Sequence, residues 1–238
     1  MMLFIKLLLA HLLGDFIFQP DKWVLEKRLK KQKSKYLYFH CIIHGILAWI
    51  LVFRIEFWPY VLIIIASHYL IDLIKLVSER KENARTWFFV DQLLHLLVLA
   101  TVSWAFAGFE PFPIISLPDQ LWLILLAAVS LTFPSSILIK MLISKWTPLM
   151  GIKEDDSLQS AGKYIGILER LLIVTFIASH HWEGIGFLIA AKSIFRFSDL
   201  KESRDRKMTE YILIGTLLSF GLAIMIGLLL TLSFRYIK

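Results

Sequence analysis

Eight apolar segments dominate this sequence, and most of them are long enough to cross a lipid bilayer as a helix, which takes roughly 17–25 mostly apolar residues. They occupy residues 2–19, 36–54, 58–77, 87–108, 119–143, 163–180, 183–197 and 210–233. Of the 238 residues, 58% are hydrophobic and only 19% are charged. A soluble fold of this length could not bury so much apolar surface. The sequence therefore predicts an all-α, polytopic integral membrane bundle of about eight transmembrane helices.

Basic residues are concentrated in alternate loops between these segments. If the N-terminus lies outside, the Lys- and Arg-rich loops around 22–35, 80–85 and 198–207 all lie in the cytoplasm. This arrangement satisfies the positive-inside rule and predicts that both ends of the chain lie outside. The same rule accounts for the net charge of +7, so no nucleic-acid partner is expected.

Two halves are predicted along the chain. Residues 1–108 would form a four-helix transmembrane half, and residues 109–238 a second one containing a cytoplasmic loop at 144–163. The boundary is placed at a proline-rich connection that includes Pro111 and Pro113. The sequence leaves homo-oligomerisation open.

Ionisable residues interrupt each of the first four apolar segments, usually as pairs four residues apart. They are His11, Asp15, His40, His44, His68, Asp72, Asp91 and His95. Residues four apart share one helix face, so each segment presents two donors in one direction. Ionisable side chains at membrane depth are costly and are functional candidates by default. We expect the eight to converge in one His–Asp cluster near the cytoplasmic side.

The first four segments also repeat a pattern. Residues 10–15 resemble residues 67–72, and residues 39–44 resemble residues 90–95, with Asp91 in the place of a histidine. This weak similarity predicts two pseudo-repeated helical hairpins, an arrangement that can build a site on a shared axis.

Five imidazoles and three carboxylates suit a borderline divalent metal, with zinc the first choice and manganese or iron as alternatives. Eight donors would hold two ions, or one ion with carboxylates that orient its histidines. An Asp that is not fully used as a ligand, Asp15 or Asp91, would serve as the catalytic base. The same pairs would also suit a proton relay or metal-free hydrogen bonding, and the sequence leaves these alternatives open.

A second set of polar residues is predicted to bind the head group of a substrate. It comprises Gln19, Lys75, Glu169, Arg170, Lys192 and Arg196. Lysine and arginine suit phosphate by charge and geometry. The alternative is structural: Glu169 would pair with Lys192 or Arg196, and Arg170 would extend to the interface.

Several of these motifs resemble a known family of bacterial membrane proteins. The resemblance rests on His11-Leu12-Leu13-Gly14-Asp15, Ser67-His68, Asp91-Gln92, Leu168-Glu169-Arg170 and Ala190-Ala191-Lys192-Ser193. Together these motifs resemble, over essentially the whole chain, the family filed as domain of unknown function 3307. That resemblance implies a multi-pass protein of the bacterial cytoplasmic (inner) membrane but no activity. The N-terminal half is loosely similar to predicted membrane-bound metal-dependent hydrolases.

The leading hypothesis is therefore a metal-dependent hydrolase that acts on a lipid or lipid phosphate at the cytoplasmic leaflet. The main alternative is a transporter of divalent metal or protons through the same cluster. The outer parts of the helices, such as residues 96–103, are almost wholly apolar, which counts against a conduit. A di-iron oxygenase is disfavoured because its dense histidine motifs are absent, and a non-catalytic membrane protein remains an alternative.

Overall fold

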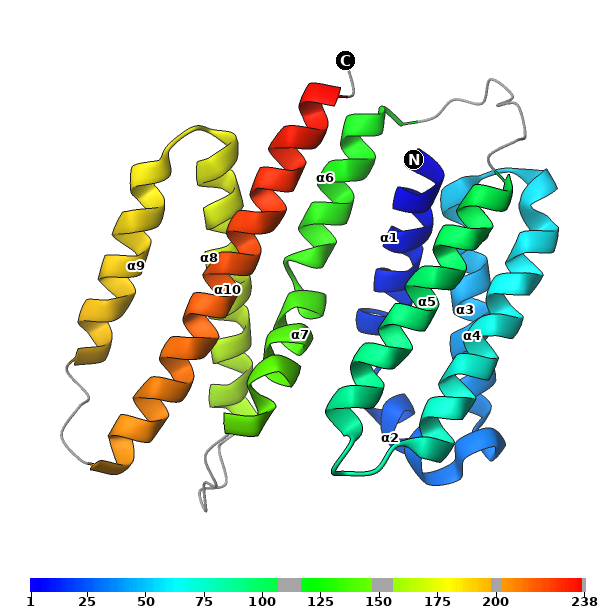
Figure 1. Ribbon diagram of the computed structural model, residues 1–238, viewed down its shortest axis with the longest axis horizontal. Helices are drawn as coiled ribbons and strands as arrows, with labels where there is room; N and C mark the ends of the chain where they lie inside the picture. Colours follow the sequence, from blue (N-terminus) through cyan, green and yellow to red (C-terminus); the bar gives the residue numbers. More distant parts are fainter. Residues whose placement is uncertain (107–116, 147–155, 198–202, 237–238) are drawn as a thin grey trace. The chain divides into compact units, whose positions relative to one another are not determined.

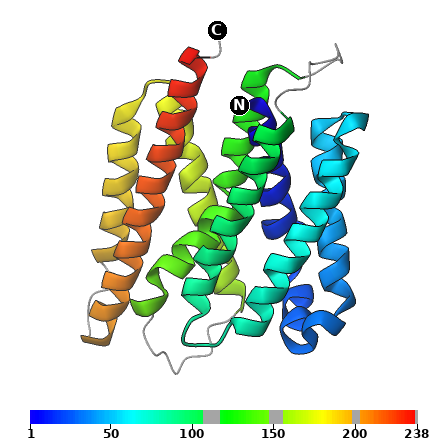
Figure 2. The ribbon, with the colours of Figure 1, turned by 45° about the vertical axis from the view of Figure 1, so that its right-hand side comes forward.

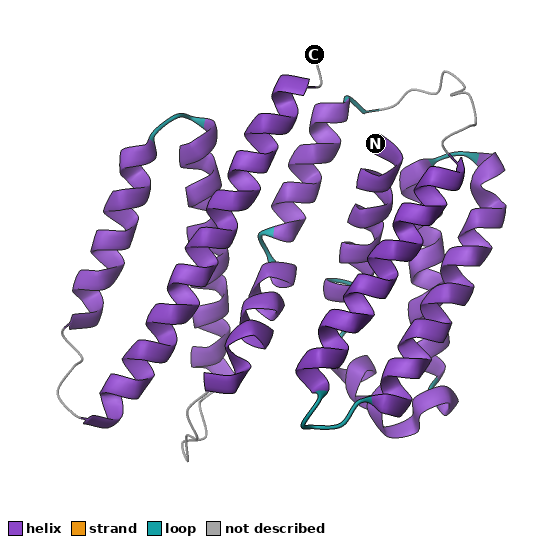
Figure 3. Cartoon of the chain, in the orientation of Figure 1, coloured by secondary structure: helices purple, strands orange, loops and turns teal. Residues whose placement is uncertain are grey.

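The structure is a computed structural model in which residues 1–106, 117–146, 156–197 and 203–236 are described, with side chains for 1–106, 117–146, 162–194 and 210–235. This part of the chain is helical apart from short connections and contains no strand (Figure 3). Its ten α-helices are α1 (Met2–Phe16), α2 (Asp21–Lys30), α3 (Lys35–Val52), α4 (Trp58–Ser78), α5 (Ala84–Phe106), α6 (Asp119–Ser130), α7 (Phe133–Ile143), α8 (Asp156–Ala178), α9 (Trp182–Phe197) and α10 (Ser203–Tyr236). The predicted all-α class is confirmed for the described residues.

Several of these helices are long and apolar enough to cross a membrane. Four segments meet both criteria: α3, residues 55–78 including α4, α5, and residues 210–235 of α10. Two consecutive pairs, α1 with α2 and α6 with α7, meet them only when each pair is joined. The described residues therefore contain four to six candidate spans, which indicates a membrane protein, and the count of eight spans stays a prediction.

The chain forms two compact units, Met1–Val129 and Ser130–Lys238. The predicted boundary near residue 108 lies inside the first unit, because this unit also includes most of α6. One contact that joins α6 to the unit is the Lys6 ammonium, which lies 4.7 Å from the ring centroid of Trp122.

Four helices of the first unit form an up-and-down bundle. Helix α1 packs against α3 and α5, and α4 packs against the same two helices, so that each neighbour runs antiparallel to the next (Figures 1 and 2). Such a ring of four helices encloses one interior line of side chains. The side chains on the inward faces of these four helices therefore determine whether each part of the interior is apolar or polar.

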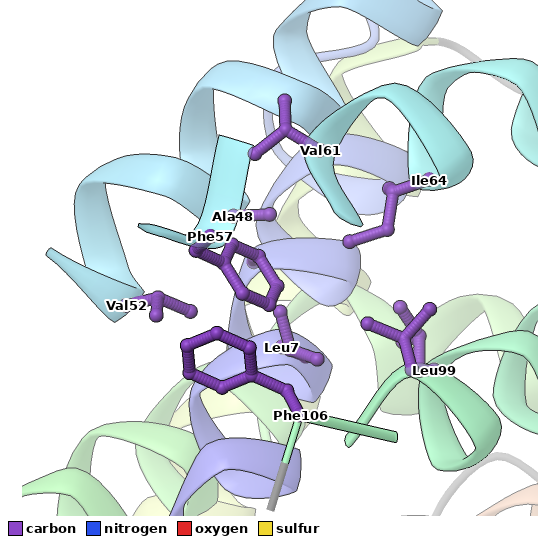
Figure 4. Close-up of a cluster of buried hydrophobic side chains, with 10 residues drawn as sticks. Leu7, Ala48, Val52, Phe57, Val61, Ile64, Leu99 and Phe106 are labelled. Atoms are coloured by element: carbon purple, nitrogen blue, oxygen red, sulfur yellow. The ribbon is translucent and has the colours of Figure 1, made fainter. Parts of the chain in front are cut away.

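The half of this interior near the start of α1 is an apolar core. Figure 4 shows Leu7 from α1, Val52 from α3 and Phe106 from α5 packed around Phe57, which precedes α4. Phe57 is fully buried, and its ring meets that of Phe106 edge-on at a centroid distance of 5.1 Å. One turn beyond Leu7 along α1, the interior becomes polar at His11.

Helix α2 leaves the bundle direction sharply. The axis of residues 21–33 is bent by 79° from that of α1. Pro20 directly precedes α2 and lacks a backbone N–H, and it disfavours a helical conformation for Gln19. The predicted first span, 2–19, accordingly ends as a helix at Phe16, and α2 crosses the end of the bundle (Figure 1).

The predicted span 119–143 is not one helix, because it is interrupted between Ser130 and Phe133. Pro134 near the start of α7 cannot donate to the carbonyl of Ser130, which instead accepts a hydrogen bond from the Ser135 hydroxyl. The predicted loop 144–163 is also shorter than expected. A 3₁₀ turn covers Ser144–Trp146 and α8 begins at Asp156, while residues 147–155 lie outside the described residues.

Arg170 of α8 supplies donors to this interruption. Its Nε donates to the carbonyl of Leu131 at 2.7 Å, and its Nη2 donates to the carbonyl of Thr132 at 3.0 Å. Further bonds reach the hydroxyls of Ser136 and Ser219. Arg170 is only 2% exposed, so the expectation that it extends to the interface is wrong. It stays inside because backbone carbonyls at the interruption would otherwise lack hydrogen-bond donors in an apolar setting.

We predict that Arg170→Met lowers the free energy of unfolding by about 2–4 kcal/mol, because two buried carbonyls lose donors at ~1–3 kcal/mol each. Denaturant titration in detergent micelles measures this change. Arg235→Met, at an exposed position of α10, is the matched control and should be nearly neutral. An Arg170→Met protein as stable as the control would contradict this role.

Candidate metal centre

The polar half of the first unit brings the eight residues of the predicted His–Asp cluster together. They come from all four bundle helices, two from each, because the spacing of four puts both donors of a helix on its inward face. All five histidines, Asp72 and Asp91 are buried, and the Asp15 side chain is 12% exposed. The cluster thus lies almost wholly out of contact with solvent.

The tightest group surrounds one oxygen of Asp15. Its Oδ1 lies 3.2 Å from His40 Nε2, 3.1 Å from His44 Nε2 and 3.6 Å from His68 Nε2. Ligand atoms of these four residues all lie within 4.8 Å of one another. Three imidazoles and one carboxylate form a complete donor set for a tetrahedral divalent ion.

Two further donor groups adjoin the first. His11, His68 and His95 form one, and Asp72, Asp91 and His95 form the other. The ring of His68 stacks on that of His95 at a centroid distance of 4.0 Å, which joins the groups into one continuous cluster. The structure therefore brings together every residue for which the sequence predicted a metal-binding role.

Two ammonium groups are inserted into this cluster. Lys27 Nζ lies 2.8 Å from Asp72 Oδ2, and Lys75 Nζ lies 2.8 Å from Asp91 Oδ2. The Lys27 side chain is only 7% exposed, although its helix, α2, lies at the end of the bundle. Two of the three carboxylates thus pair with a lysine, whereas Asp15 has no lysine or arginine partner among the described residues.

Gln92 ties Asp15 to the rest of the cluster. Its amide nitrogen donates to Asp15 Oδ2 at 2.8 Å and to Asp91 Oδ2 at 3.2 Å, and its amide oxygen lies 3.3 Å from His11 Nε2. The second oxygen of Asp15 is therefore held in place while Oδ1 faces three histidines.

Gly14 allows the close approach of α1 and α3 at the cluster. A Cβ atom at this position would lie 2.5 Å from both Cε1 and Nε2 of His44. No larger residue fits without displacing that ring, so the glycine lets the imidazole lie directly against the α1 backbone.

Several polar atoms of the cluster have no hydrogen-bond partner in the structure. Among the described residues they include His44 Nε2, His95 Nε2 and Asp91 Oδ1. The 3.1 Å contact between His44 and Asp15 is short but does not meet hydrogen-bond geometry. Unsatisfied buried donors and acceptors are rare and costly, and a bound ion would satisfy atoms of this kind.

The residues predicted to bind a head group are divided between the units. Lys75 belongs to the cluster, and Gln19, after α1, has a buried Nε2 without a partner. In the second unit Lys192 Nζ lies 2.5 Å from Glu169 Oε2, which is the structural pairing that the sequence left open. Arg170 is bonded to the α6–α7 interruption, and the side chain of Arg196 lies outside the described residues.

Two residues of the cluster were not predicted as part of the site. From the sequence alone, Lys27 belongs to a basic loop, and Gln92 contributes only to the family resemblance. Lys27 lies 45 positions before Asp72, so no short-range spacing connects them. The sequence does contain a weak indication for Gln92, because a polar amide next to Asp91 in an apolar segment is a candidate for the same site.

Part of the chain matches the model of a known family. Residues 3–112 match the family model described as "Protein of unknown function (DUF3307)", which confirms the resemblance over that region. Neither the curated proteins nor the solved structures contain a match to this chain. The similarity to predicted metal-dependent hydrolases and the bacterial origin stay predictions.

We predict that Lys27→Met costs about 3–5 kcal/mol in unfolding free energy, because it leaves the Asp72 carboxylate buried without its cation. The double variant Lys27→Met/Asp72→Asn should recover much of the loss. Lys30→Met is the control on the same helix, since its exposed pair with Glu26 contributes about 0–1 kcal/mol. Equal effects of Lys27→Met and Lys30→Met in a denaturant titration would contradict the buried pairing.

Proposed function

Since residues 3–112 match a family model whose description assigns no activity, we propose from the His–Asp cluster that this chain is a membrane-embedded, metal-dependent hydrolase. The observation that carries the proposal is the convergence of five imidazole Nε2 atoms and three carboxylates inside an apolar bundle. These nitrogen and oxygen atoms have too few N–H hydrogens among them to complete a hydrogen-bonded network. They therefore suit a bound cation better.

The charges of the cluster favour one divalent ion. If all five imidazoles are neutral, as binding requires of those that are ligands, three carboxylates and two ammonium groups leave a single negative charge. One divalent ion would make the site singly positive, whereas two would leave it with three positive charges in an apolar interior. The ion would be held by Asp15, His40, His44 and His68, because Asp15 has no lysine partner.

Zinc suits this set best, and manganese or iron would also be accepted by nitrogen and carboxylate ligands. A bound ion of this kind activates water and polarises a phosphoryl or acyl oxygen. Four protein ligands fill a tetrahedral site, so catalysis needs either a fifth position or the release of one ligand when substrate binds. The ligand that a substrate could reach most easily is Asp15, the most exposed of the four proposed ligands.

Asp91 would act as the general base. Its Oδ2 is held by Lys75, while Oδ1 has no hydrogen-bond partner and can accept a proton. The Gln92 amide joins Asp91 to Asp15, so the base would lie beside the ion. Lys75, with a side chain 23% exposed, would be the first contact for an anionic head group, together with Gln19. Lys192 and Arg196 stay predictions as further contacts.

The substrate would be a lipid or lipid phosphate at the cytoplasmic leaflet of the bacterial inner membrane. The basic residues of α2 and of the α4–α5 turn lie at the polar end of the bundle and favour this orientation under the positive-inside rule. Eight crossings, with both ends outside and the first four forming two pseudo-repeated hairpins, complete the proposed topology.

Transport through the cluster is less well supported. The interior beyond the cluster is the apolar core around Phe57 and Phe106, which offers an ion no ligands. A conduit needs polar groups along its whole length. The polar half alone suits a reaction site that opens to one side of the membrane.

We predict that detergent-purified protein holds close to one divalent ion per chain, measured by elemental mass spectrometry. His44→Ala/His68→Ala should lose the ion because it removes two of four ligands, while circular dichroism still reports a helical protein. His180→Ala/His181→Ala changes two exposed histidines and should keep it. A wild type that takes up neither zinc, manganese nor iron(II) would refute the metal site.

We predict that Asp91→Asn keeps the ion but lowers hydrolysis by about 100-fold or more, the size of a lost general base. Released phosphate and fatty acid from a panel of phospholipids and lipid monophosphates measure the rate. Asp119→Asn, at an exposed position of α6, is the control. Ion movement into sealed vesicles without any product would favour transport instead.

A further inference from the structure

A small basic cavity lies at the end of the first unit, apart from the His–Asp cluster. Its volume is about 240 Å³. It is lined by Lys30, Lys31, Gln32, Lys33, Leu73 and Val77. Three lysines from one short segment thus face two apolar residues of α4 across the same space. A cavity with a cationic side and an apolar side suits a ligand that has an anionic group and an apolar part.

The backbone brings the lysines together. Helix α2 ends at Lys30, and Lys31, with a positive φ of 50° and ψ −126°, leaves the helical conformation at the start of the 3₁₀ turn Lys31–Lys33. A positive φ is uncommon for a residue other than glycine. Three cationic side chains within four positions therefore project from one tight turn.

Most of this positive charge is uncompensated. Lys30 has a carboxylate partner, Glu26, at 3.3 Å. Within the described residues, neither Lys31 nor Lys33 lies at salt-bridge distance from a carboxylate. The cavity therefore attracts an anion that the protein does not itself supply.

The apolar side of the cavity continues along α4. Leu70, Ile74 and Val77 are 56%, 50% and 60% exposed and follow the i, i+4, i+7 spacing of one helix face. In a membrane protein this stripe contacts lipid chains. A ligand with an anionic head in the cavity could lay its acyl chain along these residues.

Helix α2 has the character of a helix that lies at the membrane surface. It is bent 79° from the direction of α1, and its Leu25 and Leu29 are 61% and 75% exposed on one face. The neighbouring Arg28 and Lys30 are also exposed. Exposed apolar residues flanked by basic ones are typical of interfacial helices that attract anionic lipids.

We propose that this turn is a binding site for an anionic phospholipid, with its phosphate held by Lys30, Lys31 and Lys33 and its chains packed on α4. The cavity is smaller than the roughly 300–1,000 Å³ of sites that enclose a drug-sized ligand, so it would enclose only a head group. The site does not depend on the metal centre, and it would fix α2 at the surface, where Lys27 reaches Asp72.

The test is native mass spectrometry of detergent-purified protein titrated with dioleoyl phosphatidylglycerol or dioleoyl phosphatidylcholine. Because three lysines would attract the anionic head group, we expect wild type to prefer phosphatidylglycerol by at least about tenfold. The variant K30Q/K31Q/K33Q should lose that preference, and K30R/K31R/K33R should retain it. Treatment with a metal chelator should leave it unchanged, which separates this test from that of the hydrolase.

The matched control is R80Q/K81Q/R85Q, which removes three positive charges from the α4–α5 turn and the first turn of α5, outside the cavity. It should bind phosphatidylglycerol as wild type does. An unchanged preference in K30Q/K31Q/K33Q, or an equal loss in the control, would overturn the proposal. Displacement of the lipid by an equal concentration of inorganic phosphate would also overturn it, because the site would then recognise the free anion alone.

Discussion

The burial of three carboxylates inside an apolar four-helix bundle is the constraint on which the first unit depends. An isolated charge in such an interior is costly, and it persists only with partners. Asp72 and Asp91 each have an ammonium group at 2.8 Å, and Asp15 has the Gln92 amide and three imidazoles. The bend before α2 also stabilises a buried carboxylate, because it places Lys27 at the end of the bundle, where its ammonium group pairs with Asp72.

The bundle is divided along its length into an apolar and a polar half. The buried residues around Phe57 in one half are all hydrophobic, whereas the eight inward His and Asp residues lie in the other half. The apolar half stabilises the bundle by burial, and this allows the polar half to keep atoms without hydrogen-bond partners. A rigid apolar support beside an unsatisfied donor set is what a preorganised binding site requires.

The second unit also contains buried polar groups that need partners, and different residues supply them. Pro134 interrupts a helix in an apolar setting and frees backbone carbonyls, and the buried Arg170 donates to two of those near the break. Glu169, its neighbour in the chain, pairs with Lys192 of α9. Adjacent charged residues that looked like an anion pocket in the sequence thus stabilise the helices around them.

The sequence by itself determined the helical class, the membrane character and the eight inward donors. It could do so because apolar length and a spacing of four residues are local properties of a helix. Only the tertiary structure decided that Lys27 and Gln92 belong to the cluster, that Asp15 alone lacks a lysine, and that residues 119–143 form two helices. The first two outcomes depend on contacts between residues far apart in the chain, and the place of Lys27 depends on the angle between α1 and α2.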